Sequence, residues 1–337
     1  MAWVVRALLP ELLLSLLVSS TLGQSIPNSK PINGSLLVNV IGAQGNAVDK
    51  LSKESFHLRV NGKEATIVSA NYSRGSRRIV VLLDMSGSMT EGIGPEKWQI
   101  AREAVTEVLR QTPAEAPIAM VTFDGKAREV MDFSHGRSAI ANWLSDPSTQ
   151  RPHLKYPAKT ALFDSLLECL RLLGPVEKGD SIVAITDGGD NASKGSFLQI
   201  EELLLRSQVR LFTFLFSDHM PTPEEENGYN SFLQLVDDTG GHAFSIVGRP
   251  FPNRSSWETQ YFNDNKVHDR MRATAQILRI MVDGYWILET ETPVTEKKKN
   301  KINLTLSFDT EKERKNAIIT YSLLSPSTAQ QQPATTQ

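Results

Sequence analysis

The stretch that decides the fold is Ile79-Val80-Val81-Leu82-Leu83-Asp84-Met85-Ser86-Gly87-Ser88. Its first five residues are apolar and rich in β-branched side chains, which is typical of a strand buried on both faces of a sheet. The next five place one carboxylate and two hydroxyls in a tight turn that contains a glycine. Oxygen donors packed this closely are the ligands that Mg2+ or Mn2+ prefers. The stretch therefore predicts a buried strand with a divalent-cation site at its carboxyl end.

Length, composition and charge set the broad class of protein. The chain has 337 residues, which is enough for one large domain and a smaller one, and its 40% apolar content is ordinary for a globular protein. A net charge of -2 gives no bulk attraction to nucleic acid, so we expect no nucleic-acid partner. The single cysteine, Cys169, falls in a predicted helix and excludes an internal disulfide.

Residues 1–23 have the features of a secretory signal peptide. Arg6 provides a positive start, an apolar run follows that is strongest over 12–18, and small residues precede Gly23. The apolar run is interrupted and short for a bilayer span, although an uncleaved anchor stays open as an alternative. We expect a secreted or periplasmic protein of the bacterial cell envelope, with no transmembrane segment beyond this peptide.

The rest of the chain divides by its pattern of apolar residues. Strands alternate with amphipathic helices in the middle, which predicts an α/β fold with a doubly wound, mostly parallel sheet. Short strands lie on both sides of this region, and neither set is large enough to bury a face alone, so we expect them to combine into one small β-sandwich. The predicted parts are a signal peptide (1–23), an N-terminal β segment (35–75), the α/β domain (76–248), a loop and helix linker (249–284), a C-terminal β segment (285–323) and a disordered tail (324–337).

Two later residues belong with the turn at Asp84. Thr160 ends a long polar loop and precedes a predicted helix, and Asp187 follows the apolar strand 181–185. In open α/β sheets, ligands bind outside the carboxyl ends of the strands. We therefore expect the turn, Thr160 and Asp187 to lie on one rim of the sheet.

In this order and context the five positions resemble the metal-ion-dependent adhesion site of the von Willebrand factor type A family. The matching residues are Asp84, Ser86, Ser88, Thr160 and Asp187. The resemblance covers about residues 76–248, and the flanking strands resemble those of bacterial secreted von Willebrand A-related proteins. It implies that Ser86 and Ser88 bind Mg2+ (or Mn2+) directly, Thr160 directly or through water, and the two aspartates largely through water.

The resemblance also implies a function. A cation held mainly by neutral hydroxyls is under-neutralised, so it would accept an Asp or Glu carboxylate from a partner protein. We expect an exported, metal-dependent protein-binding module rather than an enzyme. Two alternatives stay open: an envelope assembly or scaffold protein that docks without metal, and a Mg2+-dependent hydrolase. The hydrolase is disfavoured because the chain has no Gly-x-Ser-x-Gly, phosphate-loop or His-Glu-x-x-His motif.

Overall fold

The structure is a computed structural model, and the residues that it describes all fall within one compact unit, 31–337. The described ranges are 33–75, 77–90, 97–149, 159–216, 223–247, 267–293, 300–308 and 316–326. The predicted signal peptide lies outside these ranges.

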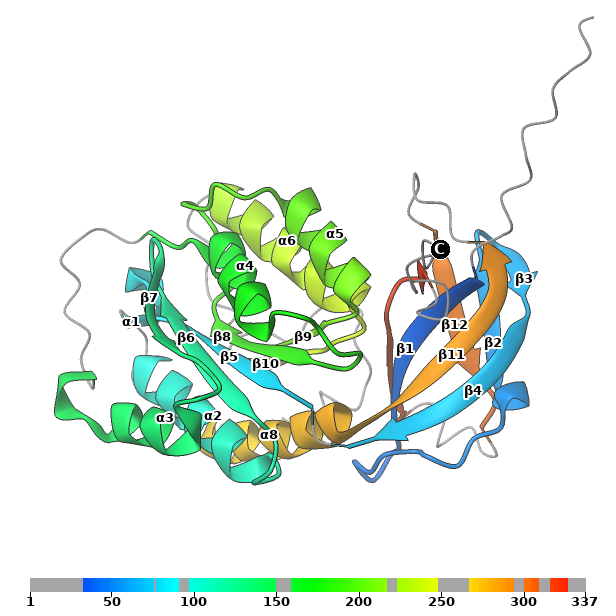
Figure 1. Cartoon of the computed structure of the whole chain (residues 1–337), viewed down its shortest axis with the longest axis horizontal. Coiled ribbons are helices and arrows are strands. Elements are labelled where there is room, and N and C mark those ends of the chain that lie inside the picture. The colour runs from blue at the N-terminus through cyan, green and yellow to red at the C-terminus, as the bar shows by residue number, and fades with distance from the viewer. Residues whose placement is uncertain are drawn as a thin grey trace, which may run out of the picture. The chain divides into compact units, whose positions relative to one another are not determined.

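A six-stranded sheet forms the centre of the α/β domain (Figure 1). Its strands run in the order β10-β9-β8-β5-β6-β7, and neighbouring pairs are parallel except for β6 and β7. Every residue of β5, β6, β8 and β9 is buried, as the continuous apolar runs predict. The bounds are β5 Ile79–Asp84, β6 Ile118–Phe123, β7 Ala127–Met131, β8 Ser181–Thr186, β9 Arg210–Phe216 and β10 Ala243–Val247.

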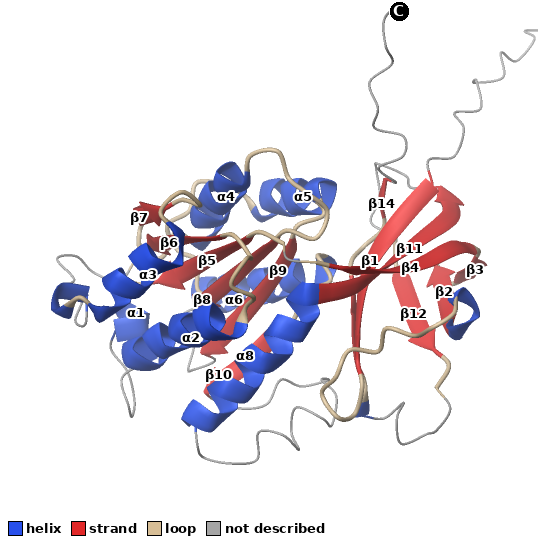
Figure 2. Ribbon diagram, turned by 60° about the horizontal axis from the view of Figure 1, so that its bottom comes forward, coloured by secondary structure: helices blue, strands red, loops and turns tan. Residues whose placement is uncertain are grey.

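Helices cover both faces of this sheet (Figure 2). Val81 and Leu83 of β5 face a core built with α2, α3 and α8, whereas Val80 and Leu82 face a core built with α4, α5 and α6. The expected doubly wound, mostly parallel architecture is therefore confirmed. The helices are α1 Gly87–Thr90, α2 Lys97–Gln111, α3 Gly136–Ser145, α4 Leu162–Leu173, α5 Phe197–Ser207, α6 Pro223–Asp238 and α8 Val267–Asp283, with short 3-10 turns η1 Lys53–Ser55 and η2 Pro147–Thr149.

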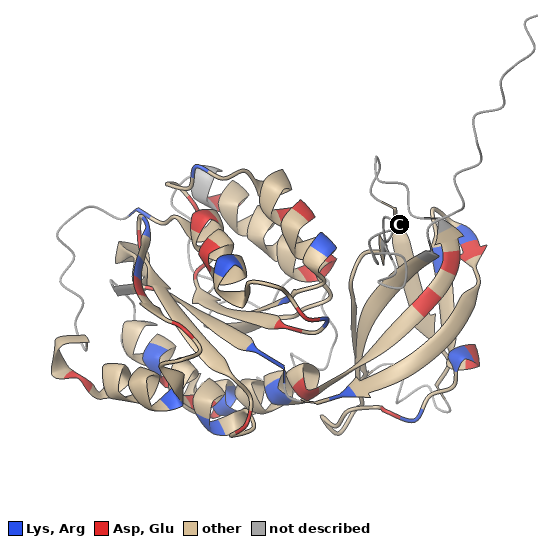
Figure 3. Ribbon diagram, viewed as in Figure 1, with Lys and Arg blue, Asp and Glu red and all other residues tan. Residues whose placement is uncertain are grey.

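None of the described helices is long and apolar enough to cross a membrane. Acidic and basic residues are interspersed along these helices, as Figure 3 shows. A lone cysteine in a predicted helix is most simply a buried structural residue, and Cys169 lies on α4 with no exposed surface.

The flanking strands form two further antiparallel sheets. One has the order β13-β1-β11-β4, with β14 also beside β1, and the other has the order β12-β2-β3. Because β1 comes from the N-terminal part and β11 from the C-terminal part, the two flanks combine as expected. The strands are β1 Asn33–Ile41, β2 Phe56–Val60, β3 Lys63–Ala65, β4 Ile67–Arg74, β11 Gly284–Pro293, β12 Ile302–Leu306, β13 Ile318–Tyr321 and β14 Ser325–Pro326.

Trp286 lies in the shared core of these two sheets. Its ring meets the rings of Phe56 and Tyr72 edge-on, each at a centroid distance of 5.3 Å. Its indole N–H donates to the carbonyl of Val48 at 2.8 Å, which satisfies the polar atom of an otherwise buried side chain. One C-terminal residue therefore contacts three parts of the N-terminal segment.

Two details of the flanks differ from the expectation. The Asn61-Gly62 pair predicts a hairpin whose second strand continues over 65–68. The hairpin forms, with both residues at positive φ, but that strand does not continue through Thr66. Instead β3 ends at Ala65, and the chain crosses into the other sheet as β4. The predicted disordered tail begins too early, because Ser325 pairs with Ser35 of β1 and its hydroxyl donates to the carbonyl of Leu205 at 3.1 Å. A polar composition does not reveal a sheet edge that is available for pairing.

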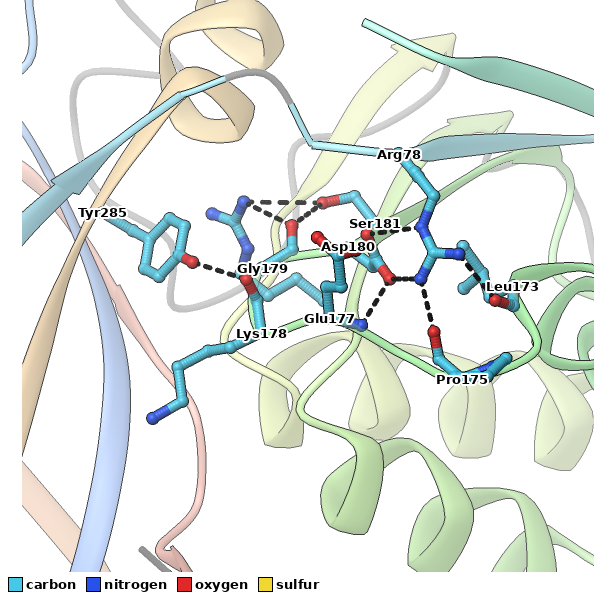
Figure 4. A network of polar contacts seen from close by, with 10 residues as sticks. Arg78, Leu173, Pro175, Glu177, Lys178, Gly179, Asp180, Ser181 and Tyr285 are labelled. Carbon is cyan, nitrogen blue, oxygen red and sulfur yellow. Dashed lines mark hydrogen bonds and ion pairs between the residues drawn. The ribbon is translucent and has the colours of Figure 1, made fainter. Parts of the chain in front are cut away.

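Buried polar contacts join the α/β domain to β11 (Figure 4). The guanidinium of Arg210, on β9, is fully buried and donates to the carbonyls of Met281 at 2.6 Å and Gly179 at 3.2 Å. It also lies 4.3 Å from the centroid of the Tyr285 ring, whose hydroxyl donates to the carbonyl of Lys178 at 2.8 Å. Burial lowers the pKa of Arg210 to about 10, so the group stays charged at neutral pH.

Candidate metal centre

The carboxyl ends of β5 and β8 place two of the predicted site residues side by side. The two strands are parallel neighbours, with Leu83 opposite Ile185. Asp84 is the last residue of β5, and Asp187 follows directly after Thr186, the last residue of β8. Both carboxylates therefore lie at the same edge of the sheet, as the topology of an open α/β fold predicts.

The Asp84 carboxylate is fully buried and held by two donors. One oxygen accepts the backbone N–H of Ser86 at 2.8 Å, and the other accepts the hydroxyl of Thr186 at 2.6 Å. Burial raises the pKa of Asp84 to about 7, and the nearby charge of Asp187 adds to the rise. Two carboxylates thus share a poorly hydrated space in which a cation would relieve their repulsion.

Ser86 and Ser88 bring their hydroxyls together in the turn that follows. Their oxygens lie 3.1 Å apart, with Ser86 fully buried and Ser88 partly exposed. The backbone holds this turn at both sides, because Met85 N donates to the carbonyl of Phe123 at 2.7 Å and Met89 N donates to that of Ser86 at 3.1 Å. The alternate spacing of the two serines therefore puts both hydroxyls on one side of a fixed turn.

Thr160 reaches the same rim from the loop before α4. Its side chain is buried, and its backbone N–H donates to the side-chain oxygen of Asn191 at 2.8 Å. The next residue, Ala161, donates its N–H to the carbonyl of Asp124 at 2.8 Å, just beyond β6. The segments that follow β6 and β8 therefore contact the Thr160 segment, and the five predicted residues lie at the same carboxyl-terminal edge of the sheet.

The structure adds Thr186 and Asn191 to the residues named from sequence. The Thr186 hydroxyl donates to Asp84 and accepts the N–H of Gly188 at 3.0 Å, so one side chain links the two aspartate loops. Gly188 is at φ +85, and a Cβ there would lie 2.9 Å from the Tyr229 ring, which explains the glycine. In the sequence, the only sign that Thr186 belongs to the site is its position beside Asp187. For Asn191 the only sign is its place in the same loop.

The donor set fits a small, hard cation. It consists of two carboxylates and three hydroxyls, all of which are oxygen ligands suited to Mg2+. Among the described residues, no cluster of three or more His, Cys, Asp or Glu side chains is arranged to hold a metal. A cation at this rim would bind hydroxyl oxygens as well as carboxylates.

A comparison with known protein families agrees with this fold. The family model for the von Willebrand factor type A domain matches residues 79–189, which run from the first residue of β5 to just beyond Asp187. The chain therefore contains a von Willebrand factor type A domain. Domains of this family are in general protein-interaction modules rather than catalysts. No curated protein matches the chain at a significant level.

Several solved structures are similar to the chain. BatB from Bacteroides thetaiotaomicron has 16% identity and a TM-score of 0.41, and the match covers 61% of this chain and 98% of that one. An aerotolerance-related membrane protein from Bacteroides fragilis has 17% identity and a TM-score of 0.40, with 60% and 98% covered. A von Willebrand factor type A protein from Catenulispora acidiphila has 11% identity and a TM-score of 0.39, with 88% and 72% covered.

Proposed function

We propose that the chain is an exported protein-binding module that recognises its partner through a Mg2+ ion. Asp84, Ser86, Ser88, Thr160 and Asp187 would hold the ion, and the partner would contribute an Asp or Glu carboxylate. Export is proposed from the signal-peptide features of residues 1–23 alone.

One observation carries the metal site: the buried, neighbouring carboxylates of Asp84 and Asp187 next to the paired hydroxyls of Ser86 and Ser88. Two buried carboxylates without a neutralising charge are unfavourable when both are ionised. The raised pKa of Asp84 reflects this free-energy cost of ionisation. A divalent cation would offset it. Structural ion pairs can also shift pKa values, so the hydroxyl pair matters, because it supplies the further oxygen ligands that a cation needs.

Different residues of the chain would have different roles at the cation site. When bound, the cation would supply a Lewis-acidic position open to an external carboxylate. Thr186 holds the Asp84 carboxylate in one orientation, and the short turn that begins α1 fixes the two serines. The described rim thus provides a rigid set of oxygens, and no nucleophile or general base is required for its role.

Metal binding can be tested directly with Mn2+ as the probe. Titration of the full chain with Mn2+, followed by electron paramagnetic resonance, should show one bound ion that Mg2+ displaces. The double variant Ser86→Ala and Ser88→Ala should lose this ion. The matched control is the double variant Ser145→Ala and Ser148→Ala, because both of those serines are exposed on or near α3 and should leave binding unchanged. Binding that survives in the Ser86 and Ser88 variant would refute the site.

Partner recognition requires a second measurement. Proteins captured from bacterial envelope extract by the immobilised chain are compared with and without EDTA, and with the Asp187→Ala variant. Metal-mediated recognition predicts that at least one partner is lost under both conditions. Partners that stay bound in both would favour the alternative of an assembly or scaffold protein that docks without metal. Turnover of phosphoesters that Asp84→Ala abolishes would favour the hydrolase.

A further inference from the structure

The loop that follows Asp187 is bonded to the backbone of Thr160 in both directions. The side-chain oxygen of Asn191 accepts the N–H of Thr160 at 2.8 Å. In return, the backbone N–H groups of Asn191 and Ala192 both donate to the carbonyl of Thr160 at 3.0 Å. The donor and the acceptor of the Thr160 main chain are therefore both used by this one loop.

A second set of contacts joins the same two segments at the start of α4. The N–H of Asp164 donates to the hydroxyl of Ser193 at 3.0 Å. The two carboxylate oxygens of Asp164 accept the N–H groups of Lys194 at 3.0 Å and Gly195 at 2.8 Å. Asp164 lies in the first turn of its helix, where a carboxylate is also favoured by the helix dipole. These bonds again run in both directions between the loop and the helix.

The approach of the two segments is close. A Cβ at Gly195 would lie 3.1 Å from an oxygen of Asp164, so a larger residue there would require the Asp164 carboxylate or the loop to shift by a few tenths of an ångström. The loop is also closed on itself, because the Asp190 carboxylate accepts the N–H of Ser193 at 3.2 Å. The Asp187 loop and the Thr160 segment therefore form one hydrogen-bonded unit.

We infer that Asn191 and Asp164 are positioning residues that fix Thr160 relative to Asp187 at the cation site. This inference rests on the proposed function, because it takes Thr160 and Asp187 as ligands. Neither Asn191 nor Asp164 is itself a proposed ligand. Asn191 would act through the Thr160 backbone, which limits where the threonine hydroxyl can lie, and Asp164 would act through its bonds to the loop that follows Asp187.

The inference can be tested with three substitutions in the full chain. Asn191→Ala removes the acceptor for the Thr160 N–H, whereas Asn191→Asp keeps an acceptor oxygen at the same place. Asn142→Ala is the matched control, because Asn142 is exposed on α3. Two quantities are measured: site-resolved hydrogen exchange of the Thr160 amide in EDTA, and Mn2+ affinity by electron paramagnetic resonance.

We expect Asn191→Ala to speed exchange of the Thr160 amide and to weaken Mn2+ binding about tenfold, the lower end of what loss of a ligand-orienting partner costs. Asn191→Asp should restore amide protection, a readout that its added charge alone would not produce. Unchanged exchange in Asn191→Ala, or faster exchange with Mn2+ affinity unchanged, would overturn the inference. If Asn191→Ala does not fold, Ser193→Ala is measured in its place, because it removes the hydroxyl that accepts the Asp164 N–H. Wild-type Mn2+ affinity in Ser193→Ala would overturn the inference.

The result also separates this inference from the proposed function. If the wild-type chain binds no Mn2+, the proposed function fails. Exchange of the Thr160 amide in the metal-free protein would still show whether Asn191 holds that segment. If the wild-type chain binds Mn2+ and Asn191→Ala and Ser193→Ala bind it equally well, the proposed function stands and the positioning role fails.

Discussion

Replacement of Thr186 by valine tests the link between the two aspartate loops. The substitution keeps the β-branched shape and removes one hydroxyl, which donates to Asp84 at 2.6 Å and accepts from Gly188 at 3.0 Å. Both contacts are buried. Water therefore cannot easily replace the lost partner at either atom.

The size of the effect follows from these two contacts. Loss of a hydrogen bond to a charged group costs about 1.5–3 kcal/mol, and a buried N–H left without an acceptor costs about 1–3 kcal/mol. The new methyl group returns about 0.8 kcal/mol through apolar burial. At pH 8, where Asp84 with its pKa of about 7 is mostly ionised, we expect the free energy of unfolding in EDTA to fall by about 3 kcal/mol. Mg2+ affinity should fall as well, because Asp84 loses the donor that orients it.

The assay is urea denaturation followed by far-ultraviolet circular dichroism, in EDTA and in saturating Mg2+. Thr106→Val is the matched control, because the Thr106 hydroxyl is exposed and donates only to the Arg102 carbonyl one turn earlier in α2. That variant should stay within about 0.5 kcal/mol of wild type. If Thr186→Val is as stable as Thr106→Val and binds Mg2+ equally well, the Thr186 bridge does not organise the site.

Three further predictions concern the core, the thiol and the pH dependence. Trp286→Ala should lower the free energy of unfolding by about 3–5 kcal/mol, because it empties the core between the two flanking sheets; a loss no larger than that of Leu198→Ala, at a position 68% exposed, would contradict this. Burial raises the pKa of the Cys169 thiol, so this thiol should react with a disulfide reagent only after denaturation, and rapid labelling of the native chain would show that α4 opens. The folded pKa of Asp84, about 7, lies above its ordinary value of 3.8, so the fold favours the protonated carboxyl. The metal-free protein should therefore lose stability, relative to Asp84→Asn, as pH rises from about 4 through about 7. Urea midpoints of both proteins in EDTA at pH 5 and pH 8 measure this difference, and a gap that does not widen at pH 8 would refute it.

Local patterns were sufficient for the central fold. A strand buried on both faces must be apolar throughout, and an amphipathic helix must repeat its apolar residues with the helical period. The run before Asp84 and the stripe on α8 obey these rules, and the parallel sheet follows from their alternation. The same logic placed Asp84 and Asp187 at strand ends. Thr160 was recognised from its order in the motif and from its loop.

The tertiary structure decided the partners of those residues. Thr186 and Asp84 are 102 positions apart, and Ser325 contacts Leu205 across 120 positions. Such pairings depend on which strands and loops become neighbours in space. The sequence around one partner therefore does not predict the other partner. The sequence alone therefore determined that a strand ends in an oxygen-rich turn. Only the folded chain decided that Thr186 links the Asp84 turn to the Asp187 loop and that Asn191 links this loop to Thr160. Those hydrogen bonds exist only after β5, β8 and α4 have packed together.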